Sequence, residues 1–66
     1  MCEATIYVER DGRREKVMQD VARIEVTEAG IALSKLFEPP QIIQGVIREV
    51  DFLKHAVTLA AAGAGA

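Results

Sequence analysis

The residue best suited to chemistry in this chain is Cys2, its only cysteine, which follows the initiator methionine directly. Cysteine is small enough at the second position to permit removal of Met1, which would leave an α-amine and a thiol on one residue. These two groups can close a chelate ring on a soft or borderline metal ion, because the thiolate binds metals and an α-amine loses its proton near neutral pH. Cys2 is therefore a candidate metal ligand, with the amide nitrogen of Glu3 as a further donor. The alternative is a small buried hydrophobe at the start of a strand.

One chain offers too few such donors for a complete site, whereas two chains related by a two-fold axis could place two thiolates and two nitrogens around one ion. A tetragonal set of nitrogen and sulfur ligands suits nickel(II) or copper(II), while zinc prefers a tetrahedral arrangement. Copper binds such sets more tightly than nickel, so ligand type alone does not select the metal. The prediction is a metal site shared at a homodimer interface.

His55, the only histidine, is the second candidate ligand, because imidazole is a common metal donor. It would approach Cys2 if the N-terminal strand paired beside the last strand, and the alternative is a partly exposed histidine at a strand end. The acidic residues are scattered, without a pair spaced for general acid–base catalysis. The chain also has no serine–histidine–acid set, phosphate-binding loop or zinc-type cysteine spacing. The sequence predicts a protein that is not an enzyme.

Composition limits the class of protein. The chain has 66 residues, half of them hydrophobic, which makes one small domain near the lower size limit for a single core. A lone cysteine excludes an internal disulfide, so a metal or a partner chain is the expected extra stabilisation, and a homodimer is the commonest partner arrangement. The net charge is −2, whereas a nucleic-acid binder usually carries an excess of basic residues. No signal peptide or bilayer-spanning segment is evident, so we expect a cytoplasmic protein.

Alternation of apolar and polar residues predicts an all-β fold. Asp11-Gly12 is a hairpin signal, Gln19-Asp20 a polar break, and Pro39-Pro40 a strand end. A slip in the apolar phase after residue 42 predicts a bulge. The expected strands span residues 2–9, 14–18, 22–27, 31–37, 42–52 and 55–59. Such short strands must hide their edges, which predicts a small antiparallel barrel or strongly curved sheet of five to six strands, of SH3/Sm-like size, over residues 1–59. Residues 60–66 are expected to form a flexible Ala/Gly-rich tail.

Three stretches carry a family resemblance: Met1-Cys2-Glu3-Ala4-Thr5 with Tyr7-Val8, the run from Val17 to Glu25, and the run from Gly45 to Asp51. Together they resemble the CooT family, small nickel-binding accessory proteins associated with carbon monoxide dehydrogenase, over nearly the whole chain up to Leu59. The resemblance implies a dimer that binds Ni²⁺ through Cys2 and assists nickel insertion into the active-site cluster of carbon monoxide dehydrogenase. His55 belongs to no metal motif that the resemblance carries over.

Two alternatives from other classes remain open. Arg10, Arg13 and Arg14 cluster around the first turn and could contact RNA phosphates, although the chain has few aromatic residues for base stacking. A structural adaptor that docks on a partner through a sheet edge would bind neither metal nor RNA.

Overall fold

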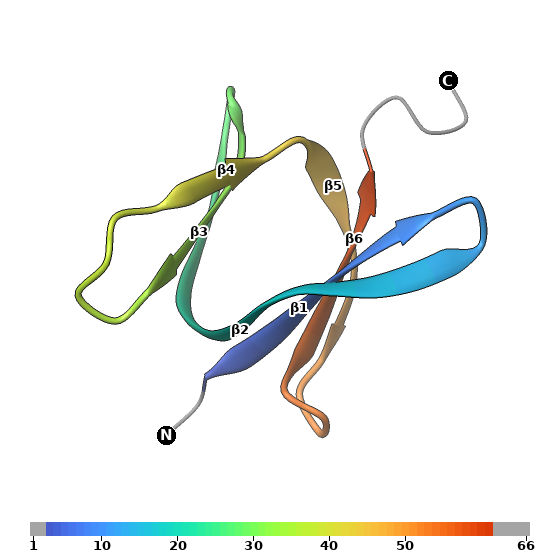
Figure 1. The fold of residues 1–66 in the computed structure, drawn as a ribbon, viewed down its shortest axis with the longest axis horizontal. Helices are drawn as coiled ribbons and strands as arrows, with labels where there is room; N and C mark the ends of the chain where they lie inside the picture. The colour runs from blue at the N-terminus through green and yellow to red at the C-terminus, as the bar shows by residue number, and fades with distance from the viewer. Residues whose placement is uncertain (1–2, 62–66) are drawn as a thin grey trace.

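The computed structural model describes residues 3–61, which form a single curled sheet of six strands (Figure 1). The spatial order is β4-β3-β2-β1-β6-β5. This architecture confirms the predicted all-β, strongly curved fold, and we call it a half-barrel. Within residues 3–61 no helix is long and apolar enough to cross a bilayer. The strands are β1 (Ala4–Arg10), β2 (Arg13–Thr27), β3 (Gly30–Lys35), β4 (Gln41–Ile43), β5 (Gly45–Asp51) and β6 (Ala56–Ala61).

Strand β2 corrects one expectation, because it is a single long strand where the sequence predicted two. The polar break at Gln19-Asp20 is a bulge, in which Asp20 adopts a positive φ of 59°. The ladder between β1 and β2 shifts register at this level, and the ladder between β2 and β3 shifts between Val21 and Arg23. A bulge bends a strand without ending it. The first half of β2 therefore pairs with β1 and the second half turns away to pair with β3.

The expected strand over residues 42–52 is divided by Gln44 into β4 and β5, which pair with opposite sides of the sheet. Strand β4 pairs with β3, and β5 pairs with β6. Gly45 sits at this corner, where a Cβ atom would lie 2.5 Å from the carbonyl oxygen of Ala60. Only glycine allows so close an approach. The predicted bulge is confirmed by a register shift between Ile47 and Glu49 in the β5–β6 ladder.

The described strands pair antiparallel except for β1 and β6, which are parallel. The chain reverses direction after β1, β2, β3 and β5 but runs on from β4 into β5. An even number of reversals gives β6 the direction of β1. Both strands therefore begin at the same end of the sheet, which brings the N-terminal segment beside the residue that precedes β6.

The core lies on the inner, concave face of the half-barrel. Ile6 and Val8 of β1 are buried there, as the alternation predicted. Strand β6 continues past the expected domain boundary at residue 59, and Ala61 belongs to the core with 8% of its surface exposed. The remaining members come from β2, β3 and β6: Val21, Ile31, Leu33, Val57 and Leu59.

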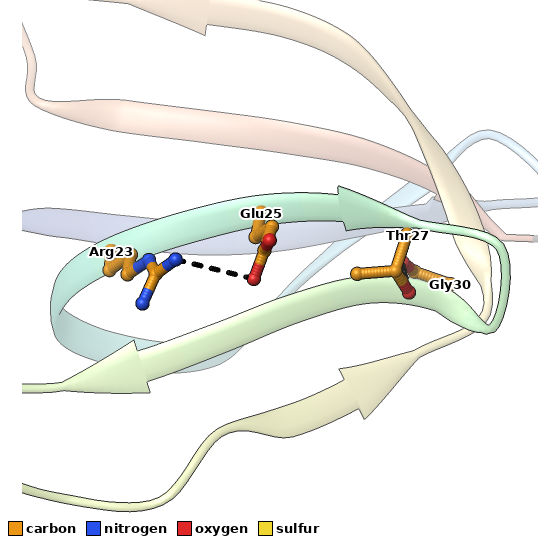
Figure 2. Close-up of polar contacts among 4 residues, drawn as sticks. All are labelled: Arg23, Glu25, Thr27 and Gly30. Carbon is orange, nitrogen blue, oxygen red and sulfur yellow. Dashed lines mark hydrogen bonds and ion pairs between the residues drawn. The ribbon is translucent and has the colours of Figure 1, made fainter.

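Side chains tie the β2–β3 turn to the corner between β4 and β5. The Thr27 hydroxyl donates to the Gly30 carbonyl oxygen at 2.8 Å and accepts from the Ala29 N–H at 3.1 Å. Figure 2 shows Thr27 facing Gly30 beside the exposed Arg23–Glu25 ion pair of β2. The Gln44 side-chain amide donates to the Ala29 carbonyl oxygen. The Gln44 bond thus fixes the corner between β4 and β5 to the β2–β3 turn.

Candidate functional site

The strongest sequence candidate, Cys2, lies outside the described residues, so its role as a metal ligand stays a prediction. The structure does show where the chain that follows it is held. The backbone N–H of Thr5, near the start of β1, donates to the carbonyl oxygen of His55 at 2.8 Å. Thr5 and Ala56 are partners at the start of the parallel ladder. The N-terminal end of β1 is thus anchored beside the turn that leads into β6.

His55 meets the condition set for it by the sequence, since the first and last strands do lie side by side. His55 is exposed, and its backbone φ is +52°. It lies in a turn whose backbone N–H groups are bonded by Asp51. One carboxylate oxygen of Asp51 accepts the backbone N–H groups of Leu53 at 3.0 Å and Lys54 at 3.1 Å. This turn presents the His55 carbonyl to β1. Over residues 3–61, no three side chains of the metal-ligating types lie close enough together to hold an ion.

An apolar groove of about 390 Å³ opens beside the start of β1, between the second half of β2 and β5. Glu3, Ala4 and His55 line one end of it, the end from which Cys2 continues the chain. Most of the other lining residues are apolar. They are Val21, Ala22, Ile24 and Val26 of β2, Ile47 and Val50 of β5, Phe52 of the next turn, and Ala56 and Val57 of β6, with Arg23 and Asp51 as charged members.

The groove exists because the half-barrel is open along this side. Ile47 and Val50 pair with Leu59 and Val57, so they lie on the face that carries the core. Nevertheless 39% of Ile47 and 46% of Val50 remain exposed, and Val26 across the groove is 68% exposed. Sequence reasoning missed this site. The apolar residues Ile47 and Val50 were the only sign of the groove in the sequence, but their pattern predicted that they would be buried.

Two exposed apolar turns lie at the same end of the sheet as the start of β1 (Figure 1). Phe52 and Leu53 occupy the β5–β6 turn and are 83% and 95% exposed. Leu36 and Phe37 occupy the β3–β4 turn, where Phe37 is 96% exposed. The latter turn reaches this end because Val21 is the register partner of both Ala4 and Lys35. Both turns therefore add exposed apolar side chains to the end of the sheet where β1 starts.

The predicted arginine cluster lies at the opposite end, on the tip of the β1–β2 hairpin. Arg10 is the cross-strand partner of Arg13, and the guanidinium of Arg14 stacks over the ring of Tyr7 at 4.5 Å from its centroid. One face of that ring is thereby covered and cannot stack on a base. The structure brings the three arginines together and separates them from the groove and His55.

Fold and groove together define a small half-barrel domain with an open apolar groove at its N-terminal end. The sequence profile of the family described as "CO dehydrogenase accessory protein CooT" matches residues 1–60. The chain therefore belongs to the CooT family, and the resemblance carried by its sequence motifs is confirmed.

A solved structure agrees in fold. The chain is similar to the crystal structure of a protein from Carboxydothermus hydrogenoformans assigned as a CooT, with a TM-score of 0.82 and 23% sequence identity. The match covers 91% of this chain and 97% of that one. At this identity the likeness establishes the half-barrel fold alone. No curated protein matches the chain.

Proposed function

We propose that this CO dehydrogenase accessory protein is a homodimer that binds Ni²⁺ through Cys2 and assists nickel insertion into carbon monoxide dehydrogenase. The observation that carries the proposal is the family match, which begins at residue 1 and so includes the cysteine. The ligand count supports the dimer, because each chain has one cysteine and one histidine. A shared ion would receive a thiolate and the α-amine from each Cys2.

The anchoring of β1 supports a role for the terminus in holding an ion. Cys2 is three residues before Thr5, whose N–H is bonded to the His55 carbonyl oxygen. Three extended residues span about 10 Å at most. The thiol is thus tethered close to the sheet, which lowers the entropy lost when two termini meet around one ion. His55 lies within the same region and could serve as a further donor.

A carrier must release its cargo as well as bind it. Thiolate and amine both lose a proton when they bind a metal, so nickel affinity should rise with pH and acidification should favour release. His55 and the β5–β6 turn beside the start of β1 are exposed, which would leave room for the ion to pass to the client enzyme. The same openness would leave the thiolates open to oxidation, which fits a reducing compartment such as the cytoplasm.

The test is an anaerobic nickel titration of the untagged protein with Met1 removed, followed by absorption spectroscopy. We expect a thiolate-to-nickel charge-transfer band that saturates at one ion per two chains. Cys2→Ala should abolish the band and weaken binding by more than about 100-fold, since losing an outer-shell partner alone costs 10–100-fold. His55→Ala on the same chain decides whether the imidazole is a ligand. Unchanged affinity and stoichiometry in Cys2→Ala would refute the proposed site.

A further inference from the structure

We propose that the first half of β2, residues 13–19, is a docking edge for an extended acidic segment of a partner protein. The segment would join the sheet as a further strand beside β2. The hollow at this edge shares no lining residue with the groove near His55, and the proposal does not depend on nickel. It places on the structure the sheet-edge docking that the sequence left open.

The first observation is a free strand edge inside the sheet. Strand β2 pairs with β1 from Arg13 to Val21, whereas β3 pairs with β2 only from Val21 onward. Beyond this bend the β1–β2 hairpin diverges from β3 and β4 (Figure 1). Among residues 3–61, no strand pairs with the other side of residues 13–19. The backbone N–H and C=O groups on that side are therefore available to an added strand.

The turn between β3 and β4 does not take this place. Strand β3 ends at Lys35, where the Glu38 N–H donates to the Lys35 carbonyl oxygen at 3.1 Å and the chain turns back. Pro39 and Pro40 follow, and neither has an N–H group to donate to a neighbouring strand. The chain thus leaves empty the position beside β2 that a longer β3 would have occupied.

The second observation is a hollow of about 350 Å³ at this position. Successive residues of a strand point to opposite faces, so a hollow above one face of β2 would be lined by alternate residues. Here four consecutive residues, 16–19, line it, which indicates that the hollow flanks the edge of the strand. The lining residues are Lys16, Val17, Met18 and Gln19 of β2, Leu33 and Lys35 of β3, Glu38 and Pro39 of the turn, and Gln41 of β4.

The third observation is the charge of this hollow, which determines the class of partner. Two of the three lysines of the chain, Lys16 and Lys35, line it. Glu38 also lines it, but within residues 3–61 neither lysine forms an ion pair. The Lys16 ammonium donates instead to the neutral side chain of Gln19 at 3.2 Å. Carboxylates on an added strand would therefore meet ammonium groups that no acid of the described chain neutralises.

The same charge disfavours a second copy of this chain as the occupant. Arg13 and Arg14 extend the positive charge along the edge, and Glu15 is the only acid among residues 13–19. This basic edge belongs to a chain whose net charge is −2, so the excess is local. Two such edges would bring like charges face to face, whereas an acidic strand is complementary to the edge.

The binding test is a titration of the full chain, labelled with ¹⁵N and free of metal, with a heptapeptide of alternating valine and glutamate. We expect amide chemical-shift changes at residues 13–19 and at Lys35. The control peptide, alternating valine and lysine, should leave these amides unchanged. Absence of the changes with the acidic peptide, or equal changes with the control, would overturn the proposal. Tighter binding of a short oligouridylate to the same amides would also overturn it, because RNA carries charge without peptide groups.

N-methylated peptides test the strand pairing itself. A strand directs its N–H groups to opposite edges at alternate residues, so methylation of the glutamate nitrogens and methylation of the valine nitrogens block opposite edges. One of these peptides should bind as the unmodified peptide does. The other should bind at least about tenfold more weakly, because it loses several backbone hydrogen bonds. Equal affinities of the two peptides would refute strand addition, and this comparison needs no protein variant.

The three lysines offer a matched set of variants for the charge. Lys16→Glu and Lys35→Glu reverse the charges in the hollow, whereas Lys54→Glu makes the same change in the exposed β5–β6 turn. Far-UV circular dichroism checks that each variant folds. The double variant at positions 16 and 35 should bind the acidic peptide about tenfold more weakly or worse, and Lys54→Glu should stay within about twofold. If the double variant and Lys54→Glu bind alike, the hollow does not hold the acidic strand.

Discussion

Replacing Gly45 by alanine tests the corner where the chain passes from one edge of the sheet to the other. The added Cβ would lie 2.5 Å from the Ala60 carbonyl oxygen, and ordinary contact begins at 3.4 Å, so the atoms must separate by 3.4 − 2.5 = 0.9 Å. The obstructing atom is backbone of β6, paired with β5 through Gly45–Ala61 and Val46–Ala60. Moving it weakens the first rungs of that ladder, and each hydrogen bond contributes about 1 kcal/mol.

Overpacking adds about 1–3 kcal/mol. We therefore expect Gly45→Ala to lower the free energy of unfolding by about 2–4 kcal/mol. A domain of this length has about 3–10 kcal/mol in total, so the loss would be a large fraction of it. Gly12→Ala is the matched control, because Gly12 has a φ of +77° but nothing within 4 Å of a Cβ. Its cost is conformational alone, about 1 kcal/mol after the lower entropy of the unfolded chain is counted.

The assay is urea unfolding followed by far-UV circular dichroism, with all variants at one protein concentration, because self-association would make the stability depend on concentration. Gly45→Ala should shift the midpoint more than Gly12→Ala, with little change in the slope of either transition. A Gly45→Ala protein within about 0.5 kcal/mol of the unchanged chain, or more stable than Gly12→Ala, would refute the steric argument.

Two further substitutions test the backbone strain at an exposed residue and the packing of a buried one. Phe37 follows Leu36 in a turn closed by the Glu38 N–H and the Lys35 carbonyl oxygen at 3.1 Å, with a φ of +63° and 96% exposure. Phe37→Gly should raise the unfolding free energy by about 0.5–1 kcal/mol, and a lower melting temperature would show that the ring makes a contact in solution. Leu59→Ala removes a fully buried side chain. It should cost about 2–5 kcal/mol in urea unfolding, and a cost below 1 kcal/mol would contradict its central place in the core.

The fold class followed from alternation, but the course of the chain did not. Residues 14–27 read as two strands because Gln19-Asp20 looks like a turn, and the structure instead absorbs Asp20 in a bulge. Residues 42–52 read as one strand and are two. These two departures leave the strand count at six but remove a reversal, which makes β1 and β6 parallel. Local patterns do not distinguish a bulge from a turn when both suit the same polar residues.

The candidate site was predictable only where chemistry depends on residue type. Cys2 and His55 stand out because each is the only residue of its kind, and the parallel pairing of β1 with β6 explains how distant parts of the chain can meet. The groove could not be found from the sequence. Ile47 and Val50 have the alternation typical of buried residues. They are exposed because β5 is an edge strand of an open sheet. That position depends on long-range pairing.

The place of β1 in the sheet also affects how the protein matures during synthesis. Strand β1 lies between β2 and β6, and β6 is the last in sequence of the strands that the structure describes. Contacts so distant in sequence form late. The Thr5–His55 bond that anchors the start of β1 cannot form until residue 55 has been synthesised. A nascent chain that has not yet reached residue 55 would carry the cysteine without that anchor.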